Sequence, residues 1–252
     1  MRIFFRIIAL NKVIFVLLFV MQINLLFSQK VEQNKVNWFA YTGQYKVNTK
    51  YGLHLEAQFR MDEDLQFSKQ HLFRIGAIYY LNKNANFVVG YGLINTLSPS
   101  VNAYFKEDRI WQQYQHTHQW KDLKSIIVNR FRLEQRFVEK VGLADGEILR
   151  LETNYQNRFR YLNRNLFFLT TINQNKDELY AIVQDEVFLN VGSNQVNAHF
   201  FDQNRFFVGL GLLTNANFRI EVGYMNHLIN PNSGADILNH TVSIALLHNL
   251  TL

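Results

Sequence analysis

Hydrophobic and polar residues alternate along most of this chain with a period of two. The stretch RFRLEQRF, residues 130–137, is the clearest example: arginine and glutamate fill the even positions, and phenylalanine and leucine fill most of the odd ones. Successive side chains of a β-strand point to opposite faces of the sheet, so this alternation predicts a strand. One face of that strand carries a row of guanidinium groups, and the other is mostly apolar.

The same alternation recurs from residue 36 onward, with no convincing helical segment between the repeats. The other alternating segments are residues 53–61, 71–81, 86–93, 109–120, 149–161, 180–191, 204–212, 217–224 and 240–247. The alternation changes phase over residues 164–177, which predicts either one more strand or a bulged extension of the neighbouring strand. We therefore expect an all-β fold, an antiparallel barrel of about 12 strands, with 10 as the alternative.

The connections between these segments fall into two length classes. Brief polar turns are expected at residues 48–50, 82–86, 121–124 and 214–217, and longer polar stretches at residues 62–69, 98–108, 138–147 and 230–236. One end with short turns and one end with long loops is typical of outer-membrane barrels.

Alternation alone also fits a secreted soluble β-sandwich, so other features must separate the two folds. The predicted strands run about 9 to 13 residues, longer than is usual in soluble sheets and close to what a tilted strand needs to cross a bilayer. The chain is 15% aromatic, and many aromatic residues lie toward strand ends, as in interfacial girdles. These features favour a transmembrane β-barrel.

The charged faces give the strongest argument for a water-filled lumen. Buried arginines in a soluble core would need paired charges, whereas arginines that line a lumen stay hydrated or pair with glutamates across it. The predicted lumen charge ladder consists of Glu56, Arg60, Arg74, Arg109, Arg130, Arg132, Glu134, Arg136, Arg150, Glu152, Arg158, Arg160, Glu186, Arg205, Arg219 and Glu221.

The first 28 residues are typical of a cleaved export signal. The basic residues Arg2, Arg6 and Lys12 come before an apolar segment at residues 13–26. Ser28 is a small residue suited to precede the cleavage site. A transmembrane anchor is the alternative, but polar residues interrupt the apolar run. We expect a signal peptide at 1–28 and a barrel domain at 29–252, placed in the outer membrane of a Gram-negative bacterium.

Removal of this signal changes the charge argument. The formal net charge of +6 includes three basic residues of the signal, so the mature chain carries +3. That balance, together with export, argues against nucleic acid as a partner. The expected partners are the lipid bilayer, lipopolysaccharide, the outer-membrane barrel assembly machinery and a small anionic solute. The chain has no cysteine.

Several short motifs resemble a bacterial family. They are NRFRLEQRF, the later NRFRY, QDEVFLN, DQNRFFVGLG and EVGYMNH, in this order after an early strand that contains Trp38. Their ordered succession resembles domain-of-unknown-function family 2490, and the resemblance covers essentially all of the chain after the signal. It implies an outer-membrane barrel with no established activity.

Three functional hypotheses follow. An excess of arginine over glutamate in the lumen favours a narrow pore or binding lumen for small, anionic solutes. The alternative is a structural or assembly barrel whose lumen is plugged by its own charges. An enzyme that modifies lipids at the rim is a third hypothesis, but no nucleophile-elbow motif is present. We expect no catalytic residue, and no metal or cofactor, because the paired His116 and His118 lack an evident third ligand.

Overall fold

The computed structural model describes residues 31–172, 177–214 and 217–251. The expected signal peptide, residues 1–28, lies outside the described residues. The contacts within the chain define a compact unit from Glu32 to Leu252, and this unit is described on its own.

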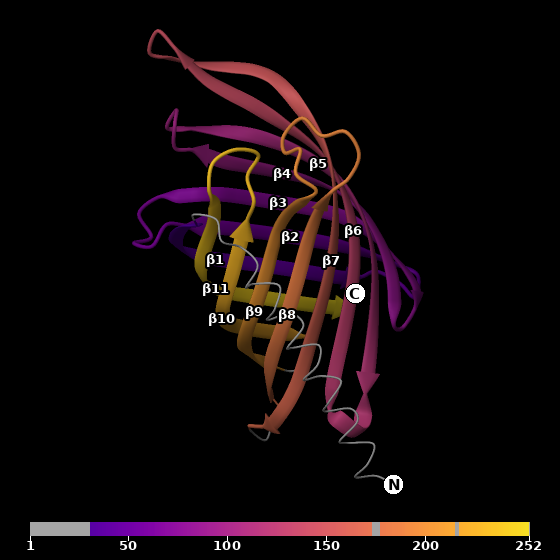
Figure 1. Cartoon of the computed structure of the whole chain (residues 1–252). Helices are drawn as coiled ribbons and strands as arrows, with labels where there is room; N and C mark the ends of the chain where they lie inside the picture. The colour runs from indigo at the N-terminus through magenta and orange to yellow at the C-terminus, as the bar shows by residue number, and fades with distance from the viewer. Residues whose placement is uncertain (1–30, 173–176, 215–216, 252) are drawn as a thin grey trace. The chain divides into compact units, whose positions relative to one another are not determined.

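The unit is an all-β closed barrel of eleven strands, and its strand order follows the chain (Figure 1). The strands are β1 (Val31–Lys46), β2 (Tyr51–Met61), β3 (Ser68–Asn82), β4 (Ala85–Ser98), β5 (Ala103–Trp120), β6 (Ser125–Ala144), β7 (Glu147–Thr171), β8 (Glu178–Asn190), β9 (Phe201–Thr214), β10 (Phe218–Ile229) and β11 (Asp236–Thr251), with a short 3₁₀ turn η1 (Lys121–Leu123) between β5 and β6.

The strand number corrects the expectation of twelve or ten. Residues 164–171 add no strand, because they continue β7, which is 25 residues long. The phase change in the sequence comes from a register shift between Phe168 and Thr170 in the pairing with β8. An extra residue at such a bulge moves the following side chains to the other face.

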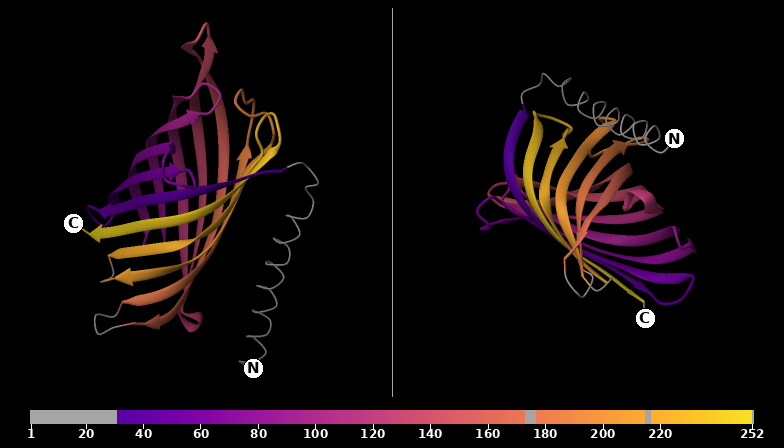
Figure 2. Two further views of the ribbon diagram at one scale, coloured as in Figure 1. Left: turned by 90° about the vertical axis from the view of Figure 1, so that its left-hand side faces the viewer. Right: turned by 90° about the horizontal axis from the view of Figure 1, so that it is seen from below.

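An odd strand number forces one parallel contact in the closed barrel. Each consecutive pair from β1–β2 to β10–β11 is antiparallel. The strands β1 and β11, which close the barrel, therefore run in the same direction, and both views of Figure 2 show them side by side. The start of β1 and the end of β11 consequently lie at opposite ends of the barrel.

The two ends differ in their connections. We call the end that carries the connections β1–β2, β3–β4, β5–β6, β7–β8 and β9–β10 the short-turn end, and the other the long-loop end. The expected loop at 98–108 is mostly strand, since β5 begins at Ala103. The expected loop at 138–147 is also mostly strand, because β6 and β7 continue into a projecting hairpin that turns at Asp145 and Gly146 (Figure 1).

These corrections share a physical reason. Each strand of a hairpin satisfies the backbone groups of its partner, so a polar sequence can stay extended without a buried face. Asp145 and Gly146 both have positive φ, 52° and 82°, as a two-residue hairpin turn requires. The long connection that the sequence did not reveal is the one between β8 and β9, residues 191–200.

Apolar clusters share the barrel interior with polar side chains. One contains Trp38, Leu166, Tyr180, Ile182, Phe207 and Met225, and a second contains Ile78, Val88 and Trp111. Two glycines make room for the largest rings: a Cβ at Gly90 would lie 2.6 Å from Trp111, and one at Gly211 would lie 2.2 Å from Tyr180. Within residues 31–172, 177–214 and 217–251, no helix is long and apolar enough to cross a bilayer.

The parallel contact between β1 and β11 can be tested with introduced cysteines, since the chain has none of its own. The rings of Tyr45 and His248 lie 5.5 Å apart, centroid to centroid. We expect Tyr45→Cys with His248→Cys to be joined by a short bis-maleimide crosslinker, detected by a changed mobility of the unfolded chain on a gel.

The matched control is Lys35→Cys with His248→Cys. Lys35 is ten residues away from Tyr45 on the same strand, about 33 Å at the usual rise per residue, so this pair should stay uncrosslinked. Crosslinking of the control pair alone would show that β1 and β11 run antiparallel.

Candidate functional site

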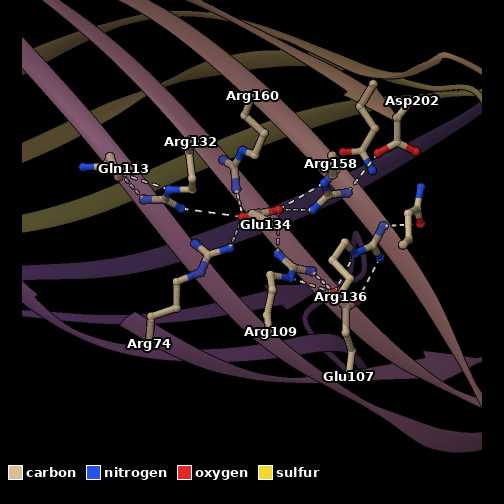
Figure 3. Close-up of polar contacts among 12 residues, drawn as sticks. Arg74, Glu107, Arg109, Gln113, Arg132, Glu134, Arg136, Arg158, Arg160 and Asp202 are labelled. Atoms are coloured by element: carbon tan, nitrogen blue, oxygen red, sulfur yellow. Dashed lines mark hydrogen bonds and ion pairs between the residues drawn. The ribbon is translucent and has the colours of Figure 1, made fainter. Parts of the chain in front are cut away.

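The inward faces of the strands bring their charged side chains together around one carboxylate, Glu134 of β6. Glu134 is fully buried, with 0% exposure, and its oxygens face guanidinium groups from three strands besides its own (Figure 3). The nitrogen-to-oxygen distances are 2.7 Å for Arg158, 2.7 Å for Arg160, 3.3 Å for Arg74, 3.5 Å for Arg109 and 3.8 Å for Arg132.

Four further carboxylates share these arginines and extend the network around the barrel. Glu56 pairs with Arg74 at 3.0 Å, Glu107 with Arg109 at 2.5 Å and Arg136 at 2.6 Å, Glu186 with Arg130 and Arg160 at 2.7 Å each, and Asp202 with Arg158 at 2.9 Å. Arg74, Arg109, Arg158 and Arg160 thus each link two carboxylates. The network joins β2, β3, β5, β6, β7, β8 and β9.

Neutral side chains complete the hydrogen bonding. The Gln113 carbonyl oxygen accepts bonds from both Nε and Nη2 of Arg132, at 3.0 and 2.7 Å, and the Gln156 carbonyl oxygen accepts one from Arg136 at 2.9 Å. Removing charges from water costs several kcal/mol per ion, and only close geometry with additional hydrogen bonds offsets that cost. The arrangement is therefore a fixed structure rather than a set of freely solvated charges.

Inward side chains fill the barrel interior at the height of this network. Nearly every strand presents an inward side chain there that is less than a tenth exposed: Trp38, Glu56, Arg74, Arg109, Glu134, Arg158, Phe188, Arg205, His227 and Thr241. Side chains with little solvent contact therefore occupy the barrel interior at this level.

A cavity of about 420 Å³ lies on the short-turn side of the network. Its walls include inward positions near the ends of β1, β5 and β11, such as Gln44, Gln119 and Asn249. Its charged lining consists of seven arginines and three glutamates: Arg74, Arg130, Arg132, Arg160, Arg164, Arg205, Arg219, Glu56, Glu186 and Glu221. The charge of this cavity is strongly positive.

Two of the lining arginines lack a carboxylate partner among the described residues, Arg205 and Arg219. Arg205 is 8% exposed and donates its Nη2 to Gln203 at 3.0 Å. Its guanidinium lies over the rings of Phe188 at 4.4 Å and Trp38 at 5.0 Å, and its buried Nε has no acceptor. Arg60, also without a carboxylate, lies over Trp38 at 3.7 Å.

Most of the predicted ladder faces the interior, but Arg150 and Glu152 do not. Both are exposed on the part of β7 that forms the projecting hairpin, where Arg150 pairs with Glu139 at 2.5 Å. The alternation continues past the barrel wall, so sequence alone does not show where the lumen ends.

Sequence reasoning missed three charged members of the interior, Glu107, Arg164 and Asp202. Glu107 fell in an expected loop, Arg164 in the segment with the phase change, and Asp202 next to a register shift in the pairing of β8 and β9. Arg164 pairs with Glu221. The spacing of Glu107 and Arg109, two residues apart like the other Arg and Glu pairs, was the available signal.

Fold and site together define a closed β-barrel whose interior is occupied by an arginine–carboxylate network. The model of the family described as "Protein of unknown function (DUF2490)" matches residues 36–238. The chain belongs to this family, which confirms the resemblance of its motifs. No curated protein and no solved structure matches the chain.

The central position of Glu134 predicts the effect of its neutralisation. In Glu134→Gln the surrounding guanidiniums lose their common anion while they stay buried. Loss of one partner of a buried charge pair costs about 3–5 kcal/mol, and we expect a loss of that order in the free energy of unfolding measured by urea titration. The control Glu152→Gln removes an exposed carboxylate and should change stability by less than about 1 kcal/mol. Equal stability of the two variants would contradict the central role of Glu134.

Proposed function

We propose that this protein is an outer-membrane β-barrel that binds a small anionic solute in its arginine-lined cavity and does not conduct through an open lumen. The observation that carries this proposal is the cationic cavity that ends on the buried arginine–carboxylate network. A binding lumen accounts for both features, whereas an open pore accounts only for the charge.

The outward face supports a membrane location. Large apolar side chains are exposed along the barrel wall, for example Ile75 at 51%, Val222 at 48% and Phe131 at 40%. The shortest strand, β2, has 11 residues, enough to cross a bilayer with the usual tilt. Backbone groups in lipid need a closed sheet or a helix, and the closed barrel meets that requirement.

The distribution of charge in the cavity supports an anionic ligand. Arg219 is the second residue of β10 and lies beside the short turn. Arg205 lies at the buried end of the cavity, where its guanidinium is over the ring of Trp38. Clefts with one sign of charge and low-dielectric walls concentrate ions of the opposite sign. Among the described residues no carboxylate pairs with Arg205 or Arg219, so the guanidinium N–H groups that they turn toward the cavity can donate to an oxyanion. The volume falls in the range of about 300–1,000 Å³ of small-molecule sites.

The binding test uses isothermal titration of the purified barrel with inorganic phosphate, sulfate and succinate. We expect measurable binding of at least one of these anions, weakened about tenfold or more in Arg205→Gln and Arg219→Gln, which corresponds to about 1.4 kcal/mol. Arg150→Gln, an arginine outside the cavity, should bind as the wild type does. Equal anion affinity of all three variants would contradict binding in the cavity.

Planar bilayers distinguish the binding lumen from the pore. Protein that migrates as a folded, heat-modifiable band should insert without steady conducting steps, because the network closes the lumen. Steady steps with an anion-biased reversal potential would instead favour the pore, and Arg132→Glu or Arg158→Glu should then reduce or reverse that bias. Absence of conducting steps together with absence of anion binding would favour a structural or assembly barrel.

One contact favours a second candidate, an enzyme at the rim. Ser68 Oγ lies 2.5 Å from His71 Nε2, and the ring of Tyr104 stacks on that histidine at 5.6 Å. A register shift next to Met61 and Ser68 lets these side chains, three residues apart, meet. Hydroxyl–imidazole pairs of this kind activate serine nucleophiles.

The purified protein can be incubated with phospholipid vesicles and with lipopolysaccharide. Fatty-acid release that is lost in Ser68→Ala would support the enzyme, and absence of release from the wild type would exclude it for these lipids.

A further inference from the structure

The outer face of β6 to β9 carries a row of polar side chains in the middle of an apolar wall. The row consists of Asn129, Asn163, Asn165, Asp185 and Asn204, and we call it the outer polar row. Asn129 pairs in register with Asn163, and Asn163 with Asp185, so three neighbouring strands contribute to one continuous line.

The alternation of each strand shows that the row faces away from the lumen. The neighbours of Asn129 and Asp185 along the chain, Val128, Arg130, Gln184 and Glu186, line the cavity. On the outward face, Asn129 lies between Ile127 and Phe131, and Asp185 lies between Val183 and Val187. A carboxylate and several amides thus interrupt an otherwise apolar surface.

Hydrogen bonds within the row use only part of its capacity. Asn163 Nδ2 donates to Asn129 Oδ1 at 2.9 Å, Asn165 Nδ2 to Asn163 Oδ1 at 2.7 Å, and Asn204 Nδ2 to Asp185 Oδ1 at 2.7 Å. Among the described residues, the side-chain N–H groups of Asn129 find no acceptor, and the Asp185 carboxylate accepts from Asn204 Nδ2 and from the backbone N–H of Glu186. Within the part of the chain that the structure describes, unused capacity therefore remains on the Asn129 amide, on the second N–H of Asn163 and of Asn165, and on Oδ1 of Asn165 and Asn204.

A second outward polar pair behaves differently. Gln112 and Gln135 donate to each other's carbonyl oxygens at 3.0 and 3.2 Å. In this pair each amide both donates and accepts, whereas in the outer polar row Asn129 only accepts within the described part of the chain.

This inference rests on the membrane location proposed above. An ionisable group on the lipid-facing side of a barrel is destabilising near the bilayer centre, and polar side chains inside membranes are usually buried against protein. A protein surface that offers both amide donors and acceptors would satisfy the row, and lipid chains would not.

We propose that the outer polar row is the contact between two copies of this barrel. A two-fold axis parallel to the barrel, passing beside β7, brings β6 of one copy opposite β8 of the other. Asn163 of the two copies then meet beside the axis, where each amide can donate to the other, and Asn129 and Asp185 of each copy lie on either side of this contact. Such an isologous contact needs a self-complementary surface, and the row provides one because its amides offer both unused donors and unused acceptors.

The first test measures the mass of the barrel, isolated from membranes and reconstituted in lipid nanodiscs or detergent. We expect a dimer for the wild type and a monomer for the double variant Asp185→Val with Asn163→Val. Both substitutions place apolar side chains toward lipid, so the variant should keep its fold, checked by heat-modifiable mobility. The matched control, Gln112→Val with Gln135→Val, should remain dimeric.

The second test locates the contact. A single cysteine in place of Asn163, near the axis, should crosslink two copies through a short bis-maleimide. A single cysteine in place of Val89, exposed at 58% on β4, should not. A monomeric wild type, or a dimer that crosslinks at Val89→Cys and not at Asn163→Cys, overturns the inference, and lipid or another protein would then cover the row.

Failure of this inference can be separated from failure of the membrane location. Flotation of the barrel with lipid vesicles tests the membrane location directly. A barrel that floats as a monomer overturns only the dimer, whereas a barrel that does not float overturns the membrane location itself.

Discussion

The burial of one carboxylate, Glu134, constrains the rest of the barrel interior. Its charge is fully removed from water and is stabilised only because Arg158 and Arg160 reach it at 2.7 Å and further guanidiniums surround it. These arginines come from β3, β5, β6 and β7, so the contact holds separate parts of the wall at a fixed distance. The closed lumen and the shape of the cavity floor both follow from this arrangement.

The interior divides its arginines between two roles. Those that bind two carboxylates, such as Arg158 with Glu134 and Asp202, are neutralised and hold the structure. Among the described residues, Arg205 and Arg219 have no carboxylate partner, and both face the cavity. A barrel that needed only a plug would gain nothing from these unpaired charges, since burying an unpaired cation is unfavourable. Their presence beside a cavity is the physical basis for the proposed binding of an anion.

The outer face of the barrel also contains a few polar side chains among many apolar ones. Most outward side chains are apolar and suit lipid, and the Gln112–Gln135 pair is internally satisfied. The outer polar row keeps unused donors and acceptors across β6 to β8. Inside and outside, unused polar groups on an otherwise completed surface are the basis of the two proposals: a small anion within the lumen, and a second barrel at the wall.

The sequence by itself determined the fold class and most of the charged interior. Because side chains alternate strictly along a strand, Arg132, Glu134 and Arg158 could be assigned to one face without knowledge of the strand order. Only the tertiary structure decided the strand number, since the bulge near Phe168 imitates a strand boundary, and the exposure of Arg150, since β7 extends beyond the wall. It alone also decided which arginines pair. Those contacts join strands far apart in the chain, and their geometry depends on register and barrel closure, which local periodicity does not contain.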